Sequence, residues 1–380
     1  MNTIPNKIYQ VCFATLEYPP DIGGIGKSAK RITKFLSQEN FDVHIFTPII
    51  EKEKAVGEYT SKFEDSKTIY RINTYGSSDV DKVFKHVIQE IDAQIHFDIF
   101  HGFYLFKAFP CIEIADGKRP VIASFRGIDA YWMRQPDLFS KTMRILNEAT
   151  WITSVSKDIL KLACSLKDIS SNSSFLPNSI NQVTEESWKL NCFNRGVVGT
   201  VATFRPKKNI PLLLDAYAHI DVNIRKKVLL VGDFMLNRKK DWQRERSFKK
   251  MLEYYDITKE VEVTGIVDND AVNDYLRRMN VFVLSSIHEG LPNSILEAAA
   301  IGLPIVSTAI DGIKDVFEHK KNALLVPEGD MIALRNAVSE LLRNDDLAYE
   351  LSMGAIELSL QLSPNKEGSE WLNLYHSLLK

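Results

Sequence analysis

Short apolar runs alternate with longer amphipathic segments along the chain, a pattern typical of parallel strands joined by crossover helices. The first run, Ile8–Thr15, is continuous and apolar, which predicts a buried strand. The segment Lys27–Leu36 places its apolar residues on one helical face, which predicts a helix. The same alternation predicts strands at Val43–Thr47, Asp98–His101, Val121–Phe125 and Trp151–Val155, and a helix at Phe139–Leu146.

A second series of the same kind begins near Val197. Its predicted strands are Val197–Ala202, Lys227–Val231, Val261–Thr264, Val281–Ser285 and Pro304–Thr308, and its predicted helices are Ile210–His219, Ala271–Arg278, Ile295–Ile301 and Met331–Leu342. The polar stretch Ser170–Asn194 separates the two series, so we place the linker there. We therefore predict one α/β domain over residues 1–180, a second over 181–362, and a C-terminal segment, 363–380, with helical apolar spacing.

The composition is that of a globular protein. The chain has 380 residues and a formal net charge of −2, so no overall positive field attracts nucleic acid. Its four cysteines, Cys12, Cys111, Cys164 and Cys192, lie far apart and form no metal-ligand spacing. The sequence contains no run of about 18 apolar residues. We therefore expect a cytoplasmic protein with reduced thiols, and we leave peripheral contact with the inner membrane face open.

The sharpest chemical signal is the stretch from Glu289 to Glu297, which follows the predicted strand Val281–Ser285 and opens a helix. Ligands of open α/β sheets bind at such strand-to-helix crossings. Pro292 suits the first turn of the helix, and the amides of Asn293–Ile295 would point at an anion with the helix dipole behind them. Glu297 suits hydrogen bonds from paired hydroxyls such as those of a ribose. An ordinary helix start with solvated carboxylates accounts for the spacing equally well.

This stretch and its surroundings resemble the retaining glycosyltransferases of family four. Glu289 to Glu297 matches their E-x7-E motif, and the string from Leu284 to Val306 is similar to their signature. The resemblance implies the GT-B fold, with two Rossmann-like domains that face each other across a cleft and a C-terminal helix that crosses back to the first. It implies that Glu297 holds the ribose of a nucleotide-sugar donor and that Glu289 contacts the transferred sugar. The other donor-binding residues that it implies are Gly290, Leu291, Pro292 and Asn293, with Ile266 and Val267 lining the base pocket.

A basic loop, Phe204–Asn209, lies between the first strand and the first helix of the second half. A departing nucleotide gains negative charge, which fixed Arg and Lys side chains can stabilise in place of a metal. A solvated basic loop is the plainer interpretation. The family places an arginine and a lysine of this loop on the donor diphosphate, and we assign these roles to Arg205 and Lys208, although Thr203 occupies the usual arginine position. We predict no metal and no cofactor, and we interpret the acidic triplet Asp268–Asp270 as a helix cap.

A glycine-rich loop follows the first predicted strand. Gly23 to Ser28 resembles a phosphate-binding P-loop, but Asp21 stands where that pattern requires glycine and two prolines separate the loop from its strand. The family carries two adjacent glycines in a loop of this form, facing the donor phosphates, and Gly23 and Gly24 match them. Small residues there would let backbone amides approach the phosphates. A P-loop-like nucleotide-binding protein is the secondary hypothesis.

The first half departs from the family pattern at one motif. Many relatives have His-Gly-x-Asp after a strand of this domain, whereas this chain has Arg126, Gly127, Ile128 and Asp129. Arginine cannot accept a proton, since it stays charged, so we assign Arg126 and Asp129 to an acceptor or sugar pocket that receives an anionic group. An ion pair between Arg126 and Asp129 is the structural alternative. His101, at the end of a predicted strand, is a further candidate for this pocket, with a core histidine as the commoner alternative.

The resemblance implies a metal-independent enzyme that transfers a sugar from a nucleotide-sugar donor to the hydroxyl of a glycan, a lipid-linked glycan or a small molecule, with retention, in surface polysaccharide or glycoconjugate biosynthesis. A GT-B-fold sugar-nucleotide epimerase is one alternative, and a nucleotide-binding subunit without activity is another. The segment 238–250 carries three basic clusters around Trp242 and Phe248. If this segment is helical and one-sided, it is suited to anionic lipid; a solvated helix face is the common alternative.

Overall fold

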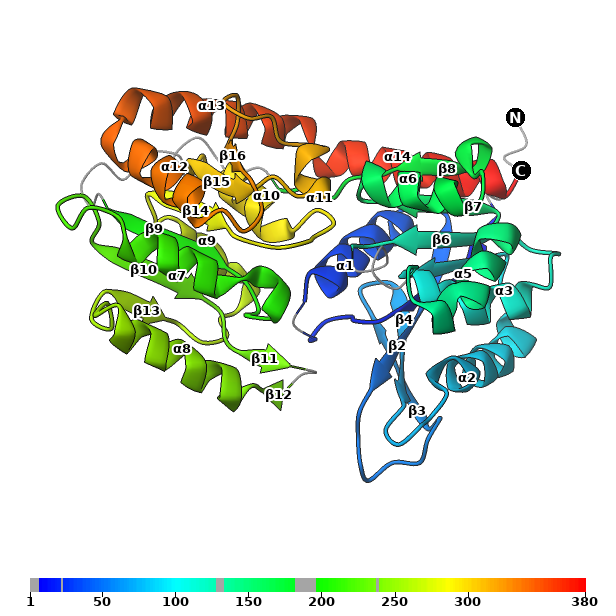
Figure 1. Ribbon diagram of the computed structural model, residues 1–380. Coiled ribbons are helices and arrows are strands. Elements are labelled where there is room, and N and C mark those ends of the chain that lie inside the picture. The colour runs from blue at the N-terminus through cyan, green and yellow to red at the C-terminus, as the bar shows by residue number, and fades with distance from the viewer. Residues whose placement is uncertain (1–6, 22, 128–132, 182–195, 237–238) are drawn as a thin grey trace. The chain divides into compact units, whose positions relative to one another are not determined.

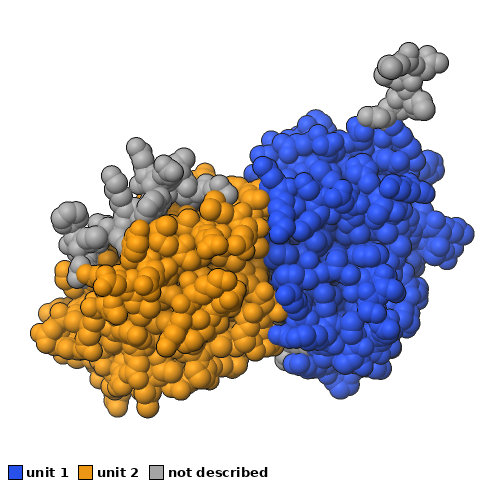
Figure 2. Space-filling view, turned by 90° about the horizontal axis from the view of Figure 1, so that it is seen from above, with its two compact units in different colours: residues 1–178, 365–380 blue, residues 179–364 orange. Residues whose placement is uncertain are grey.

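The computed structural model describes residues 7–21, 23–127, 133–181, 196–236 and 239–380 of the chain, and the side chains of 235–240 are left aside. The chain divides into two compact units, one formed by residues 1–178 and 365–380 and the other by residues 179–364 (Figure 2). Each unit contains its own sheet with helices on both faces (Figure 1). We describe the two units separately.

Unit 1 is built on an eight-stranded sheet of order β3-β4-β2-β1-β5-β6-β7-β8. All neighbouring strands are parallel except β3 and β4, which pair antiparallel. The strands are β1 (Tyr9–Thr15), β2 (Phe41–Ile49), β3 (Tyr59–Glu64), β4 (Lys67–Asn73), β5 (Ile99–Phe103), β6 (Val121–Phe125), β7 (Trp151–Ser154) and β8 (Ser173–Phe175). The helices are α1 (Gly24–Ser37), α2 (Val80–Ile95), α3 (Ala108–Ala115), α5 (Pro136–Glu148), α6 (Lys157–Leu166) and α14 (Pro364–Leu378).

Unit 2 is built on a six-stranded sheet of order β13-β10-β9-β14-β15-β16, in which every neighbouring pair is parallel. The strands are β9 (Val197–Val201), β10 (Lys227–Val231), β13 (Val261–Val263), β14 (Val281–Leu284), β15 (Ile305–Thr308) and β16 (Leu324–Val326), with a separate hairpin of β11 (Met235–Leu236) and β12 (Lys239–Lys240). The helices are α7 (Ile210–Ala218), α8 (Trp242–Tyr254), α9 (Val272–Leu276), α10 (Asn293–Ala300), α11 (Asp311–Lys314), α12 (Met331–Arg343) and α13 (Asp345–Gln361).

The C-terminal helix α14 belongs to unit 1, although the rest of the unit ends at residue 178. Its Trp371 and Tyr375 are fully buried in the apolar cluster that β1 and α1 share. Glu367 accepts two hydrogen bonds from the guanidinium of Arg31 on α1, at 2.6 and 3.2 Å. Gly368 allows close contact because a Cβ there would lie 3.1 Å from the ring of Phe35. Apolar burial and one charge-assisted pair therefore hold the end of the chain against the first sheet.

The structure corrects the assignment of His101 to a pocket. This residue lies on β5 and is completely buried. Its Nδ1 is 2.7 Å from the hydroxyl of Tyr375, and its Nε2 is 2.7 Å from the hydroxyl of Ser124. Burial, with a smaller contribution from the charge of Arg126, holds the pKa of His101 well below its usual value of 6.5. His101 is therefore a neutral core histidine that ties α14 to the sheet.

A pH dependence of stability follows from this burial. Because the pKa of folded His101 lies below the unfolded value, the unfolded chain binds a proton that the folded chain does not, so stability is lost as pH falls below about 6.5. We expect His101 to contribute a slope of up to about 1.4 kcal/mol per pH unit to the unfolding free energy in that range. Urea denaturation between about pH 5 and 8 should show a shallower slope for His101→Gln. If the unfolding free energy depends on pH in the same way in both proteins, His101 is not a neutral buried residue. Burial also lowers the pKa of His44, but that residue is present in both proteins and contributes equally to both curves.

Candidate functional site

The strand order of unit 2 identifies one point at the carboxyl edge of its sheet. The chain runs from β9 outward to β10 and β13, and then returns to β14 on the other side of β9 before it continues to β15 and β16. The loops that follow β9 and β14 therefore leave the sheet in opposite directions. Ligands of open α/β sheets bind at such a switch point. The two loops are those that sequence analysis selected, the basic loop after β9 and the stretch that begins with Glu289 after β14.

An ion cluster joins these two loops. The carboxylate of Glu289 accepts from Lys207 Nζ at 2.9 Å and pairs with Lys208 Nζ at 2.7 Å. The Glu289 side chain is only 8% exposed, and those of Lys207 and Lys208 are 22% and 14% exposed. One carboxylate thus lies between two ammonium groups, so the cluster carries a net positive charge at the switch point. Lys207 is absent from the predicted site, although the basic run of the loop already contained it.

The neighbouring lysines hold Glu289 in its ionised form. Burial by itself raises the pKa of Glu289, but the neighbouring charges of Lys208 and Lys207 outweigh that effect and bring it from its usual 4.5 down to about 2. Burial lowers the pKa of Lys208, and the proximity of Glu289 opposes that shift. Glu289 is therefore a carboxylate at neutral pH and is not a general acid in this state.

Hydrogen bonds from the end of β14 fix the two loops to each other. The hydroxyl of Ser285 donates to the carbonyl oxygens of Lys208 and Asn209, at 3.0 and 3.1 Å. The N–H of Ile287 donates to the carbonyl oxygen of Lys207 at 2.8 Å. The hydroxyl of Thr308, at the end of β15, donates to the carbonyl oxygen of Ser286 at 2.6 Å. The lysines and the glutamate are thus carried on backbone that is held in place before any ligand binds, which favours a site of fixed charge.

The loop that carries Glu289 is also held from its other side. A Cβ built on Gly312, in α11, would lie 1.4 Å from the carbonyl oxygen of Gly290 and 3.0 Å from that of Glu289. Only glycine therefore allows α11 to approach this backbone so closely. Gly290 itself has no left-handed backbone.

Helix α10 begins at Asn293, two residues before the predicted start at Ile295, and Pro292 precedes its first turn instead of lying within it. Pro292 is the residue before its first turn, with φ −65° and ψ 133°, and Asn293 opens the helix without a side-chain cap from Pro292. Leu291 and Asn293 are buried, and Glu297 is half-buried in the second turn. The order Glu289, Gly290, Leu291 and Pro292 therefore runs from the ion cluster directly into the start of a helix. An anion at the cluster would lie near the positive end of that helix dipole.

Arg205 occupies a different environment from the two lysines that follow it. Its side chain is exposed and lines a cavity of about 640 Å³. Within the described residues, its guanidinium forms no hydrogen bond or ion pair, so it is available to a ligand. Three phenylalanines, Phe204, Phe234 and Phe248, line the cavity. Its other lining residues are Arg205, Pro206, Asn209, Ile210, Pro211, Asp241, Gln243, Arg244, Ser247 and Met251. Ile266 and Val267 follow β13, two strands away from β9 along the same edge.

The remaining predicted residues lie in unit 1. Gly23 and Gly24 stand at the start of α1, and a Cβ on Gly23 would lie 1.8 Å from Oε2 of Glu17. Arg126 follows β6; its guanidinium lies 4.3 Å from the centre of the Phe103 ring and donates to Oδ1 of Asn178 at 2.6 Å. Asp129 lies outside the described residues, so the structure does not address its pairing with Arg126.

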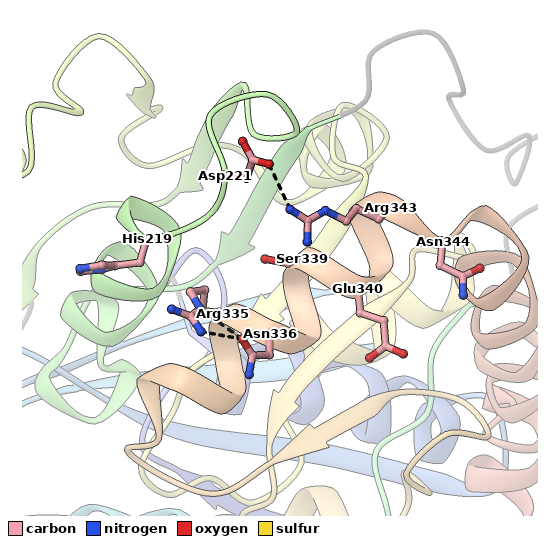
Figure 3. Close-up of a pocket in the computed structure, with 8 residues that line it drawn as sticks. All are labelled: His219, Asp221, Arg335, Asn336, Ser339, Glu340, Arg343 and Asn344. Atoms are coloured by element: carbon pink, nitrogen blue, oxygen red, sulfur yellow. Dashed lines mark hydrogen bonds and ion pairs between the residues drawn. The ribbon is translucent and has the colours of Figure 1, made fainter.

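A second hollow in unit 2, of about 630 Å³, is not part of this site (Figure 3). It lies beside the end of α7 and the end of α12, at the amino edge of the sheet, where His219, Asp221 and Arg343 are found. Its Arg343 is paired with Asp221 at 3.1 Å.

In the parts of the chain that the structure describes, no group of three or more His, Cys, Asp or Glu side chains is arranged to hold a metal. Asp268 occupies the N-cap position of a short 3₁₀ turn, Asn269–Ala271, as expected, but its side chain makes no capping hydrogen bond.

Two curated relatives show how far the sequence similarity extends. The 2-deoxystreptamine N-acetyl-D-glucosaminyltransferase of Niallia circulans is 28% identical over 148 residues, which cover 39% of this chain and 38% of that relative. The chain thus aligns with less than two fifths of the length of that relative. The N-acetyl-alpha-D-glucosaminyl L-malate synthase of Bacillus anthracis is 21% identical over 375 residues, or 95% of this chain and 96% of that protein.

Solved structures show the fold. Sucrose-phosphate synthase from Thermosynechococcus elongatus superposes with a TM-score of 0.82 at 17% identity and covers 97% of this chain and 99% of its own. HepE from Anabaena, in complex with UDP-glucose, superposes with a TM-score of 0.77 at 14% identity and covers 97% and 99%. The predicted GT-B architecture of two α/β units with parallel sheets is therefore confirmed.

Two adjoining family models match the chain. The model described as Glycosyltransferase Family 4 matches residues 22–182, and the model described as Glycosyl transferases group 1 matches residues 183–357. Together they extend over both units and include the glycine loop after β1 and the ion cluster after β9 and β14. Nothing in these matches supports the P-loop or epimerase alternatives. The chain therefore belongs to the glycosyltransferases that these two family models describe.

Proposed function

We propose that the protein transfers a hexose from a nucleotide-sugar donor to an acceptor hydroxyl, with retention and without a metal. The observation that carries the proposal is the cluster of Lys207, Lys208 and Glu289 at the switch point of unit 2. Two ammonium groups on fixed backbone offer a diphosphate the positive charge that a divalent cation supplies in other enzymes. UDP-sugars are the first donors to test, because HepE, which shares the fold, is known in complex with UDP-glucose.

In this proposal each residue of the site has a separate role. Lys207 and Lys208 stabilise the charge that develops on the leaving diphosphate, and Arg205 adds a guanidinium from the neighbouring cavity. Glu297 accepts hydrogen bonds from the ribose hydroxyls. Glu289 contacts the transferred sugar and offsets the repulsion between the two lysines. Gly290, Leu291, Pro292 and Asn293 form the floor near the diphosphate, and Ile266 and Val267 line the base pocket.

The reaction that we propose needs no nucleophile from the protein. The acceptor hydroxyl attacks the anomeric carbon on the face that the nucleotide leaves, a bond forms between them, and the bond to the diphosphate oxygen breaks. The proton of the hydroxyl passes to the departing phosphate. Positioning and electrostatic stabilisation then account for catalysis.

The acceptor is assigned to unit 1 in this proposal. Arg126, held by Asn178 and packed on Phe103, presents a cation after β6, which suits an acceptor with an anionic group. A glycan or a lipid-linked glycan of polysaccharide or glycoconjugate assembly is the acceptor class that we propose. Gly23 and Gly24 are proposed to approach the donor phosphates through their amides.

A thermal-shift screen tests the donor site. The protein is heated with UDP, GDP, ADP and their sugar conjugates, each with and without EDTA. We expect one nucleotide series to stabilise the fold by about 2–3 kcal/mol at a hundredfold excess over Kd, independently of EDTA. Glu297→Ala should lose most of this stabilisation, because the substitution removes the ribose contacts. Without nucleotide, the variant should melt at the same temperature as the unmodified protein. If no nucleotide changes the melting temperature, the fold stands but the proposed activity does not.

A further inference from the structure

Helix α8 has one face whose side chains are exposed. Phe248 and Leu252 are buried in the core of the unit, and Asp241 caps the helix by accepting from the N–H of Arg244 at 3.0 Å. The outer side chains are separated by four, three, one and four residues, which places them on one side of a helix. We call this set the outer face; it consists of Trp242, Arg246, Lys249, Lys250 and Tyr254, all of them exposed.

Two aromatic residues mark the ends of the outer face. Trp242 is 69% exposed and Tyr254 is 82% exposed, so burial in the core does not explain either. The twelve residue steps between them correspond to about 18 Å of helix. Trp and Tyr are enriched where an apolar phase meets water, because their rings are apolar and their polar groups remain hydrated.

The outer face is locally basic in a chain whose net charge is −2. Its three cations lie between the two aromatic residues, with Glu253 as the exposed carboxylate beside them. Lys249 forms an ion pair with Glu245 at 2.8 Å, but Lys249 is 66% exposed and Glu245 only 16%, so the carboxylate is turned inward. Because the net charge of the protein does not attract anions, attraction to an anionic surface would come from the local positive charge of the outer face.

The position of α8 relates this face to the site. The helix follows β10 and the β11–β12 hairpin and leads to β13 (Figure 1). Because β10 and β13 are parallel, the first turn of α8, which contains Trp242, lies at the carboxyl edge of the sheet, the edge that carries the ion cluster. Arg244, Ser247, Phe248 and Met251 of the same helix line the cavity that contains Arg205. A surface bound to the outer face would therefore lie alongside that cavity.

We propose that the outer face of α8 docks unit 2 on an anionic lipid bilayer, with Trp242 and Tyr254 at the interface and Arg246, Lys249 and Lys250 against the headgroups. Charge complementarity and the two terminal aromatic residues favour lipid over duplex nucleic acid, which would meet the same cations but whose bases are already stacked on each other and do not contact exposed rings. Among the described helices, none is long and apolar enough to cross a membrane.

Vesicle flotation tests this proposal without any donor. The full chain is mixed with phosphatidylcholine vesicles that either contain or lack phosphatidylglycerol, at low and at raised salt. We expect flotation only with the anionic vesicles and a loss of binding at raised salt. Replacing Arg246, Lys249 and Lys250 by Gln should weaken binding about a hundredfold, since each cation near an anionic surface contributes about a fivefold factor. Trp242→Ala should weaken binding and leave its salt dependence unchanged.

A matched variant distinguishes binding by the outer face from a general effect of the protein's positive charge. Lys320, Lys321 and Arg343 form an equal set of exposed cations elsewhere on unit 2, and their replacement by Gln should leave flotation unchanged. The urea midpoint of each variant verifies that it is folded. Equal loss in both triple variants, equal binding to neutral vesicles, or competition by a DNA duplex at the same concentration as anionic lipid would each overturn the proposal. Because no nucleotide is present, failure here leaves the proposed transferase activity untouched.

Discussion

Replacing Glu289 by glutamine is expected to reduce sugar transfer by about a hundredfold or more while it tightens the binding of nucleoside diphosphate severalfold. In the free protein, the carboxylate neutralises part of the charge of Lys207 and Lys208, at 2.9 and 2.7 Å, and so competes with a diphosphate for the same ammonium groups. Glutamine removes that competition, but it also removes the contact that we propose with the transferred sugar. Calorimetric titration with UDP and initial rates with the donor measure the two effects separately.

The same substitution should destabilise unit 2. Two largely buried ammonium groups would lose their carboxylate, which costs about 3 kcal/mol. Because the pKa of Glu289 lies at about 2 in the folded chain, against a usual 4.5, its stabilising contribution is fully present above about pH 4.5 and is lost as pH falls toward 2. In Glu289→Gln this part of the acid sensitivity should be missing from urea denaturation curves.

Glu318→Gln provides the matched control. Glu318 also pairs with a lysine, Lys321, at 2.9 Å, but both side chains are more than 60% exposed. Such a pair contributes about 0–1 kcal/mol, so we expect nearly unchanged stability, transfer and nucleotide affinity. If Glu289→Gln binds UDP less tightly than the unmodified protein, the carboxylate does not compete with the diphosphate and the proposed arrangement of charges is wrong.

Replacing Gly312 by alanine is expected to reduce transfer at least tenfold, although Gly312 contacts no substrate in our proposal. The added methyl group would lie 1.4 Å from the carbonyl oxygen of Gly290, so either α11 or the loop that carries Glu289 must move. Overpacking of this kind costs about 1–3 kcal/mol. A shift of about 1 Å in catalytic groups is itself enough to cost about a hundredfold in rate. Initial rates together with urea unfolding measure both consequences.

Ile313→Val distinguishes displacement of the loop from loss of stability. Ile313 is the next residue of α11 and is fully buried, so removal of one methylene should cost about 1 kcal/mol without pushing on Gly290. We expect this variant to keep its turnover. Equal losses of activity in Gly312→Ala and Ile313→Val would show that the helix acts through stability alone.

Apolar periodicity was sufficient for most of the parallel strands. β1, β6, β7, β9, β10 and β14 occur within a residue or two of the predicted positions, because fully buried strands are continuous apolar runs. Strand β3 was not predicted, since it is an edge strand whose side chains are almost all exposed and carry no apolar run. The linker stretch was only partly correct: it contains β8, a short strand at the other edge of the sheet, and residues 182–195 lie outside the described part of the chain.

The family resemblance, and not local chemistry alone, selected two residues that the structure brings together. Lys208 and Glu289 were selected from two loops more than 80 residues apart along the chain, and the structure brings them into contact at 2.7 Å. Lys207 was overlooked because a run of basic residues does not say which side chain turns toward the sheet. Arg205 was selected with them, but it lies outside the ion cluster and lines the neighbouring cavity. His101 was misplaced because the residue that buries it, Tyr375, is 274 positions away.

The sequence by itself determined what depends on neighbours along the chain: the alternation of strands and helices, the helix that begins after Pro292, and the residue types able to bind a diphosphate. These features follow from backbone preferences and side-chain chemistry that act over one or two turns. Only the tertiary structure decided which charges meet, which histidine is buried and why residue 312 must be glycine. Those outcomes depend on the strand order, which brings the ends of β9 and β14 together and determines which side chains are buried. Burial in turn shifts the pKa values of the charged groups in the site.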